Sequence, residues 1–203
     1  MCQTCRIILG ILLRIYWSGA SKKHRMKVCE HLDRLIEVLN FVAKGVMSKT
    51  EPSTRRELRF ESLDEVLADV EILVSGGHRT VGNWTLAQIL THLQKTFDAS
   101  IDGFGFESNW LIRKVLGPLF KKRFLTKPLP AGFKLPKSAS AILPDSNVAL
   151  EESFAKFQKA IARLKCDKPS APHPGLGKLT PTEWNNLHLR HSELHLSFAS
   201  SST

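Results

Sequence analysis

The chain has 203 residues, of which 42% are hydrophobic and 24% are charged, as in a soluble globular protein long enough to bury a core. Lys and Arg outnumber Asp and Glu by ten (29 against 19), which permits nucleic acid, anionic lipid or an anionic small molecule as a partner, although a solvated basic surface is the simpler interpretation. The four cysteines, Cys2, Cys5, Cys29 and Cys166, are too few for a disulfide framework, which favours the reducing cytoplasm.

Residues 1–46 differ in character from the rest of the chain. The apolar run Ile7–Trp17 is shorter than the about 20 residues that a membrane-spanning helix needs, and it makes a poor secretory signal because little positive charge precedes it. Cys29–Val46 has the apolar spacing of an amphipathic helix. Two interpretations stay open: this helix packs on the main domain, or residues 1–46 are a non-native extension ahead of a start at Met47.

The regular part of the chain begins at Arg59 with a predicted helix. Ser62 followed by Glu65 has the spacing of a capping box, in which each side chain accepts a hydrogen bond from the backbone N–H of the other residue. An apolar stripe follows at helical spacing, and Gly76-Gly77 ends the helix. The stripe consists of Leu63, Val66, Leu67, Val70 and Leu73.

A second helix is predicted to begin at the capping box of Thr85 and Gln88, with Trp84 just ahead of it. His92 lies at the edge of the inner face of this helix, one helical step from Ile89, so its imidazole is expected to point toward the interior. The inner face itself consists of Ile89, Leu93, Thr96, Phe97 and Ser100.

A long basic crossover follows the second helix. Its first part, to about Phe124, has helical spacing that Gly117-Pro118 interrupts, and four later prolines exclude a long helix. The stretch Arg113–Lys137 contains no acidic residue. It offers cations to an anionic thiol or substrate near the ends of the helices, or else it is a plain solvated surface. The four prolines are Pro128, Pro130, Pro136 and Pro144.

Two more helices complete the predicted fold. The third runs from about Ser146 to Lys165, and the fourth begins at the N-cap Thr180, with Pro181 at its first position and Glu183 closing a capping box. No stretch shows the alternating pattern of a strand. The sequence therefore predicts an all-α four-helix bundle over residues 59–200, with the long basic crossover between the second and third helices.

The fourth helix carries three histidines. His191 and His195 fall on its inner face at the spacing at which two imidazoles can ligate one ion, whereas His188 falls at the flank, where partial exposure is expected. With His92 the pair would give three imidazoles from two helices, which suits zinc, nickel or iron(II) with positions left for water or substrate. A core that holds three hydrogen-bonded histidines is the alternative, and both stay open.

Several stretches together resemble the DinB-like superfamily, and within it the chain is most similar to the family called domain of unknown function 1569. They include "GNWTLAQILTHL", "NWLIRKVLGPLFKKR", "LPAGFKLP" and "HPGLGKLTPTEWNNLHLRHSELHLSF", and the resemblance covers about Arg59 to Ser200. It implies a four-helix bundle that binds a divalent metal ion through three histidines. These match His92, His191 and His195, whereas His188 matches no ligand.

The resemblance also implies a class of reaction. Better-understood relatives are thiol-dependent transferases and isomerases that use low-molecular-weight thiols such as bacillithiol or mycothiol. The expectation is a metal-dependent transferase or hydrolase that acts on a small molecule, and an anionic substrate and a low-molecular-weight thiol as cofactor both stay open. A non-catalytic metal-binding or structural four-helix module is the alternative.

The sequence also bears on other partners and on the roles of the remaining candidate residues. The basic crossover lacks the interleaved aromatics of a nucleic-acid motif, so nucleic acid is not favoured as a partner. A membrane is not favoured either, because the apolar run Ile7–Trp17 is too short, and a homodimer stays open. No general base is identified, because Glu193 points away from the metal face by helix geometry. His173 is expected to order the loop before the fourth helix, and Trp84 and Trp184 to anchor the core at the helix starts.

Overall fold

The structure is a computed structural model that describes residues 55–107, 110, 112–132 and 137–202. The chain divides into two units, and all of the described residues belong to the second, Pro52–Thr203. The predictions made for residues 1–46 therefore lie outside the described residues. Among the residues that are described, no helix is both long and apolar enough to cross a membrane.

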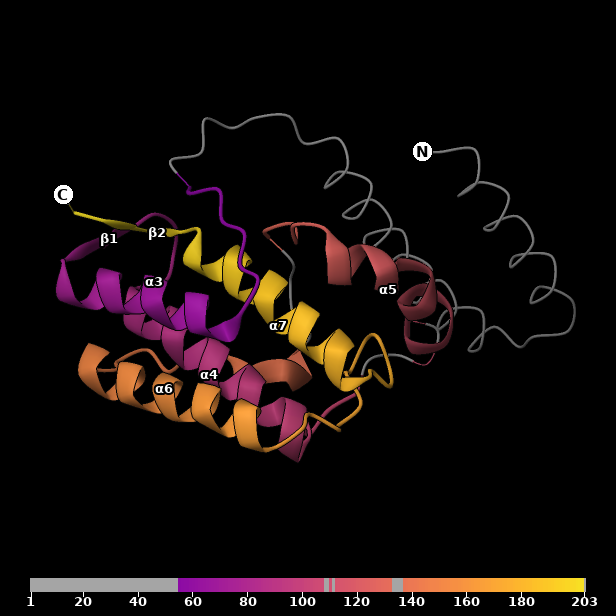
Figure 1. Ribbon diagram of the computed structural model, residues 1–203. Helices are drawn as coiled ribbons and strands as arrows, with labels where there is room; N and C mark the ends of the chain where they lie inside the picture. The colour runs from indigo at the N-terminus through magenta and orange to yellow at the C-terminus, as the bar shows by residue number, and fades with distance from the viewer. Residues whose placement is uncertain (1–54, 108–109, 111, 133–136, 203) are drawn as a thin grey trace, which may run out of the picture. The chain divides into compact units, whose positions relative to one another are not determined.

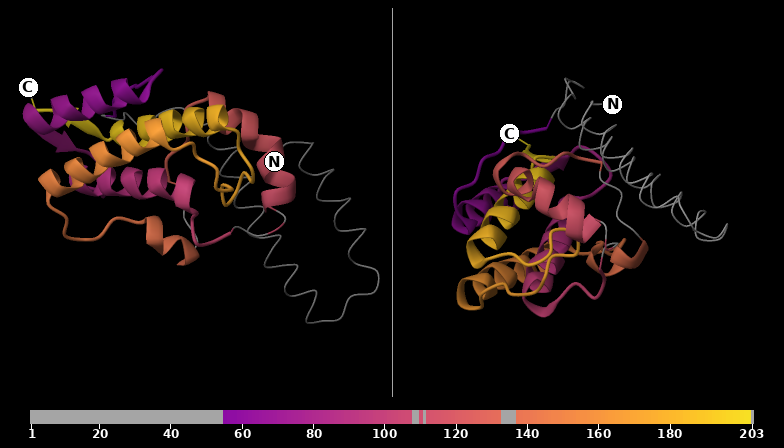
Figure 2. Two further views of the ribbon diagram at one scale, coloured as in Figure 1. Left: turned by 60° about the horizontal axis from the view of Figure 1, so that its bottom comes forward. Right: turned by 90° about the vertical axis from the view of Figure 1, so that its right-hand side faces the viewer.

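The described part of the chain is mainly α-helical, as predicted. Its four longest helices are α3 (Leu63–Ser75), α4 (Leu86–Asp102), α6 (Leu150–Cys166) and α7 (Pro181–Leu196). Helix α4 packs against α6 and α7, and α3 packs against the same two helices, as Figures 1 and 2 show. They enclose one main core, which includes Val66, Val70, Leu73, Leu86, Ile89, Leu90, Leu93, Phe97, Phe157, Ile161, Leu189 and Leu196.

Three short helical segments form the crossover between α4 and α6. A π-helix, η1 (Ile112–Leu116), runs directly into α5 (Gly117–Thr126), and a 3-10 helix, η2 (Lys137–Ile142), follows. The interruption predicted at Gly117-Pro118 is thus the point where π geometry changes to α geometry, with proline in the first turn of α5, where its missing N–H costs little. Helix α5 packs against α7.

Side-chain caps fix where three of the helices begin. The predicted boxes of Thr85 with Gln88 and of Thr180 with Glu183 are both complete. The box predicted at Ser62 forms only by half: the Ser62 hydroxyl accepts from the Glu65 amide at 3.2 Å, but the Glu65 carboxylate accepts from the Glu61 amide instead. The third helix begins at Leu150 rather than about Ser146, because Ala149 is still extended and offers no side-chain cap.

The structure also contains a short sheet, which the sequence analysis missed. Strands β1 (His78–Thr80) and β2 (Ala199–Ser201) pair antiparallel, with His78 opposite Ser201. At three residues each, the strands are too short to show an alternating pattern. Their pairing ties the chain end after α7 to the loop between α3 and α4.

The segment ahead of α3 is fastened to α7 by buried polar contacts. The Phe60 amide donates to Glu193 Oε1 at 2.7 Å, and Arg190 Nη2 donates to the Phe60 carbonyl at 2.6 Å. Arg190 and Glu193 also pair with each other at 2.7 Å, with side chains only 3% and 5% exposed. Both backbone groups of Phe60 are therefore held by one ion pair of α7. Glu193 thus has a structural role, as the acceptor of the Phe60 amide and the partner of Arg190.

Candidate metal centre

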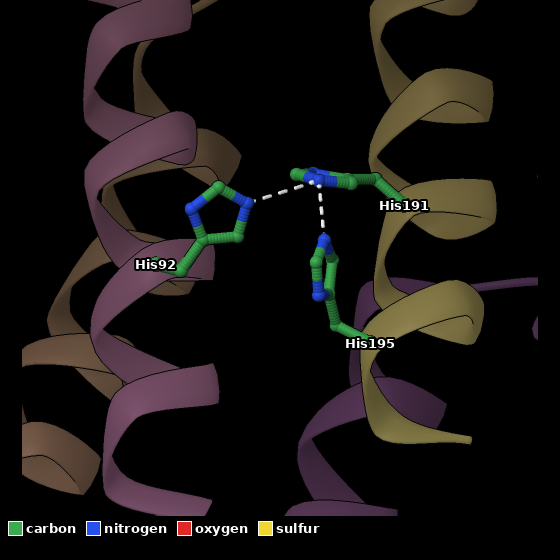
Figure 3. A group of neighbouring side chains, drawn as sticks. All are labelled: His92, His191 and His195. Carbon is green, nitrogen blue, oxygen red and sulfur yellow. Dashed lines mark hydrogen bonds between the residues drawn. The ribbon is translucent and has the colours of Figure 1, made fainter. Parts of the chain in front are cut away.

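Three histidines from two helices converge on one point in the interior. His92 comes from α4, and His191 and His195 come from successive turns of α7 (Figure 3). The Nε2 atoms of His92 and His191 lie 3.2 Å apart, and those of His191 and His195 lie 3.0 Å apart. One candidate ligand atom from each ring lies within 4.8 Å of both others. The structure thus brings together the three residues that the sequence singled out.

The two Nε2 separations from His191 match the spacing that one ion imposes on its ligands. Zinc binds imidazole nitrogen at about 2.0–2.1 Å, so two such nitrogens on one ion lie about 2.9 Å apart at a right angle and about 3.4 Å apart at the tetrahedral angle. The two measured Nε2 separations fall within this interval. The donor set, three imidazoles without a thiolate, suits zinc, nickel or iron(II).

A backbone carbonyl fixes the tautomer of His92. Its Nδ1 atom lies 2.7 Å from the carbonyl oxygen of Ile142, at the end of η2. A carbonyl can only accept, so Nδ1 carries the proton and donates it. The Nε2 atom of the neutral ring is then left with a lone pair directed at the other two histidines, which is the usual arrangement of a metal-binding histidine.

The three rings alone do not satisfy one another. His191 Nε2 faces both of the other Nε2 atoms. A neutral His191 can carry one proton on that nitrogen and can donate it to only one neighbour. If the proton lies on Nδ1 instead, the lone pairs of His191 and His92 face each other. A cation bound by all three lone pairs removes this conflict.

The surroundings keep the three rings neutral. Burial lowers the pKa of all three, and it lowers that of His195 to about 3 and that of His191 well below its ordinary 6.5. The neighbouring rings add to this effect, since His92 and His195 also lower the pKa of His191, and His92 lowers that of His195. Because only the neutral ring is a metal ligand, protons do not compete for the site at neutral pH.

Trp84 forms one wall of the site. Its ring stacks on His195, with centroids 5.4 Å apart and planes at 14°, and it contacts the His92 ring at 5.0 Å. It was predicted as a core anchor, and it does pack on the main core while half-buried. Its contact with two candidate ligands was missed, although its position directly before the cap of the His92 helix is a usable signal.

His188 lies elsewhere than predicted. It is 3% exposed rather than partly exposed at a flank. Its Nε2 donates to the Ser100 hydroxyl at 3.1 Å, since that hydroxyl already donates to the Phe97 carbonyl, and its ring stacks on Trp184. Because α4 and the start of α7 face each other here, a position at the edge of the inner face becomes fully enclosed. His188 is therefore a satisfied core histidine outside the candidate metal set.

His173 has the loop-ordering role that was predicted. Its Nδ1 accepts from the amides of Gly175 at 3.1 Å and Leu176 at 3.0 Å, which closes the turn ahead of α7. Its backbone pairs with Gly177, whose φ of 73° is one that glycine adopts without strain. The His173 ring also contacts Trp184, which is 1% exposed and anchors the core as expected.

The free energy of unfolding is expected to fall when the pH drops from about 6.5 toward 4. Unfolded histidines take up protons near their ordinary pKa of 6.5, whereas burial lowers the pKa of His173 to about 4 and that of His188 to about 3. The unfolded state therefore binds more protons over this range, at up to about 1.36 kcal/mol per pH unit for each histidine. Urea unfolding between about pH 7 and 4.5, with a chelator present, measures the slope. An equal slope in His188→Asn would contradict this account.

Comparison with known proteins places the chain in a family. No match was found among the curated proteins or among the solved structures. Residues 52–202 match the family described as protein of unknown function (DUF1569). This range contains His92, His191, His195 and every other residue of the candidate site. Since the match spans well over half of the sequence, the chain belongs to the DUF1569 family.

Proposed function

We propose that this protein is a DinB-like four-helix bundle that binds one divalent metal ion through His92, His191 and His195. The observation that carries the proposal is the convergence of three imidazoles on His191 Nε2, which lies at ligand spacing from the Nε2 atoms of His92 and His195, with the His92 lone pair set by the Ile142 carbonyl. The packing of α3, α4, α6 and α7 around one core supports the bundle assignment. The resemblance of the motifs to the superfamily supports its DinB-like character.

The proposed activity is that of a metal-dependent transferase or hydrolase that acts on a small molecule. With three protein ligands, a zinc, nickel or iron(II) ion keeps positions for a low-molecular-weight thiol or a water, and it lowers the pKa of either toward neutrality. His92, His191 and His195 hold the ion and, being neutral, leave it most of its positive charge. Trp84 stacks on the His195 ring and so covers one of its two faces.

A non-catalytic metal module is the second candidate, and burial favours it. His92 is 3% exposed, and the other two rings are half-buried, so a bound ion is enclosed on the α4 side. An ion in such a position stabilises the fold by joining α4 to α7, whether or not a substrate reaches it. The two candidates differ in one property, which is whether a bound ion has a position that an added ligand can occupy.

Cobalt(II) separates these candidates because its absorption reports the ligands around it. The full chain is loaded with cobalt(II), and cysteine or mycothiol is added as the thiol. The proposed function predicts stoichiometric binding and, on addition of thiol, a new thiolate-to-metal absorption band. His92→Ala serves as the control and should show neither. If cobalt binds but its absorption spectrum does not change on addition of thiol, the non-catalytic module is favoured. If the wild-type protein binds no divalent ion, the metal site itself is refuted.

A further inference from the structure

Three side chains on one face of α4 hold the end of the crossover. Gln88, His92 and Lys95 are spaced four and three residues apart, so their side chains lie on the same side of the helix. Each of the three donates to a main-chain carbonyl of the segment Ile142–Asp145, at the end of η2 and directly after it. His92 Nδ1 donates to the Ile142 carbonyl at 2.7 Å, Lys95 Nζ to the Leu143 carbonyl at 2.8 Å, and Gln88 Nε2 to the Asp145 carbonyl at 3.4 Å.

The carbonyl that His92 uses is fixed by its neighbours on three sides. On the chain side, the Leu143 amide donates to the Ser140 carbonyl at 3.0 Å, which closes the last turn of η2. On the interior side, the Ile142 side chain is 8% exposed and packs with Ala99 and Ala139. On the α4 side, Lys95 takes the next carbonyl along, and it also pairs with the Asp145 carboxylate at 3.4 Å.

We infer that Lys95 is a positioning residue for the metal ligand His92, because it holds the Ile142–Leu143 peptide against α4 so that the Ile142 carbonyl receives the His92 Nδ1 proton. The expected effect on metal affinity rests on the proposed function, whereas the geometry of the Lys95 contact does not. Without Lys95, the peptide can move away from α4, and the His92 ring can then rotate or place its proton on Nε2. A protonated Nε2 is no longer a ligand.

Charge and positioning predict opposite effects for Lys95, which makes the inference testable. An ammonium group near a metal site repels the ion. Its field adds to burial in lowering the pKa of His92. If charge alone mattered, Lys95→Met would bind a divalent ion more tightly than wild type. If Lys95 acts by holding the carbonyl, the same variant binds the ion more weakly, by about 10-fold, which is the lower end of what loss of a ligand's hydrogen-bond partner costs.

The structure offers a matched control in Lys121. Its side chain is as exposed as that of Lys95, at 27% for both. It too donates to a loop carbonyl, that of Lys178 at 3.4 Å, and pairs with an acid, Glu183, at 2.7 Å. The first partner, Lys178, lies in the loop before α7, and the second, Glu183, lies in the first turn of α7, so neither belongs to the segment that holds His92. Lys121→Met therefore removes the same groups without touching the Ile142 carbonyl.

The experiment measures two properties in the full chain for wild type, Lys95→Met, Lys95→Arg and Lys121→Met. The first is the zinc dissociation constant, from competition with a chromophoric chelator. The second is the tautomer of His92 in metal-free protein, from the ring nitrogen shifts in NMR. We expect Lys95→Met to weaken zinc binding about 10-fold and to lose the pure Nδ1–H form. Lys95→Arg, which keeps a donor, should restore both, and Lys121→Met should match wild type.

The outcomes separate this inference from the proposed function. Unchanged or tighter zinc binding by Lys95→Met, with the His92 tautomer unchanged, would overturn the role of Lys95 while leaving the metal site in place. If the wild type binds no zinc, the proposed function fails. The role of Lys95 is then tested by the His92 tautomer alone: loss of the pure Nδ1–H form in Lys95→Met supports it, and an unchanged tautomer refutes it. Should Lys95→Met not fold, Lys95→Leu replaces it with the same two readings.

Discussion

Replacing His191 by alanine is expected to lower zinc affinity on the order of 1000-fold. Structural zinc sites bind the ion with about 10–16 kcal/mol, so one of three ligands contributes about 4 kcal/mol, and each tenfold change in affinity is about 1.4 kcal/mol. His191 is chosen because its Nε2 contacts both other Nε2 atoms, at 3.2 and 3.0 Å, so its removal leaves two ligands on different helices. The measurement is competition with a chromophoric chelator, together with the rise in melting temperature that zinc causes.

His188→Ala is the matched control for this prediction. His188 lies on the same helix, is 3% exposed and contacts its own partner, Ser100, so its loss also disturbs the core. Both variants are expected to lose stability in the metal-free state, but only His191→Ala should lose the response to zinc. Equal zinc affinity in His191→Ala and wild type, or an equal loss in both variants, would show that the three rings are a hydrogen-bonded core cluster.

Replacing Glu193 by leucine is expected to lower the free energy of unfolding by about 3–5 kcal/mol, the usual cost of leaving a buried charge unpaired. The change leaves the Arg190 guanidinium, whose side chain is 3% exposed, without its carboxylate partner, and it removes the acceptor of the Phe60 amide. Within the described residues, Arg190 Nε and Glu193 Oε2 already lack partners, so little else can compensate. Burial also raises the pKa of Glu193, while the Phe60 amide opposes that shift. Urea unfolding near neutral pH measures the loss.

An exposed ion pair of similar length supplies the comparison for Glu193. Lys156 and Glu152 lie one turn apart on α6, meet at 2.6 Å and are 58% and 63% exposed. Because water screens this pair, Glu152→Leu is expected to change the free energy of unfolding by about 0.5 kcal/mol or less. A loss below about 1 kcal/mol in Glu193→Leu would mean that the buried contacts of Glu193 with Arg190 and the Phe60 amide do not stabilise the fold.

Features set by neighbours in the sequence were predictable. Two capping boxes and the interruption at Gly117-Pro118 involve residues within four positions of one another, and each is found where it was predicted. The box at Ser62 formed only by half, because the Glu65 carboxylate reaches the free Glu61 amide instead. The short pairing of β1 with β2 joins segments more than 100 residues apart, and nothing local marks either strand.

The candidate site was predictable only in its ligands. The spacing of His191 and His195 is local, and His92 could be added because the apolar periodicity of its helix shows which face points inward. The burial of His188 depends on how closely α4 faces the start of α7, which helix periodicity does not give. The Ile142 carbonyl was out of reach altogether, because a main-chain acceptor is present at every position and only the folded crossover brings this one to His92.

The use of a main-chain acceptor for His92 also affects how relatives should be compared. A carbonyl is supplied by any amino acid, so the residue type at position 142 can vary without loss of the contact. What must be kept is the number of residues in the loop ahead of η2, because that length places the Ile142 peptide against α4. Insertions and deletions in the loop ahead of η2, rather than substitutions at position 142, are therefore the changes expected to mark relatives whose candidate metal centre has diverged.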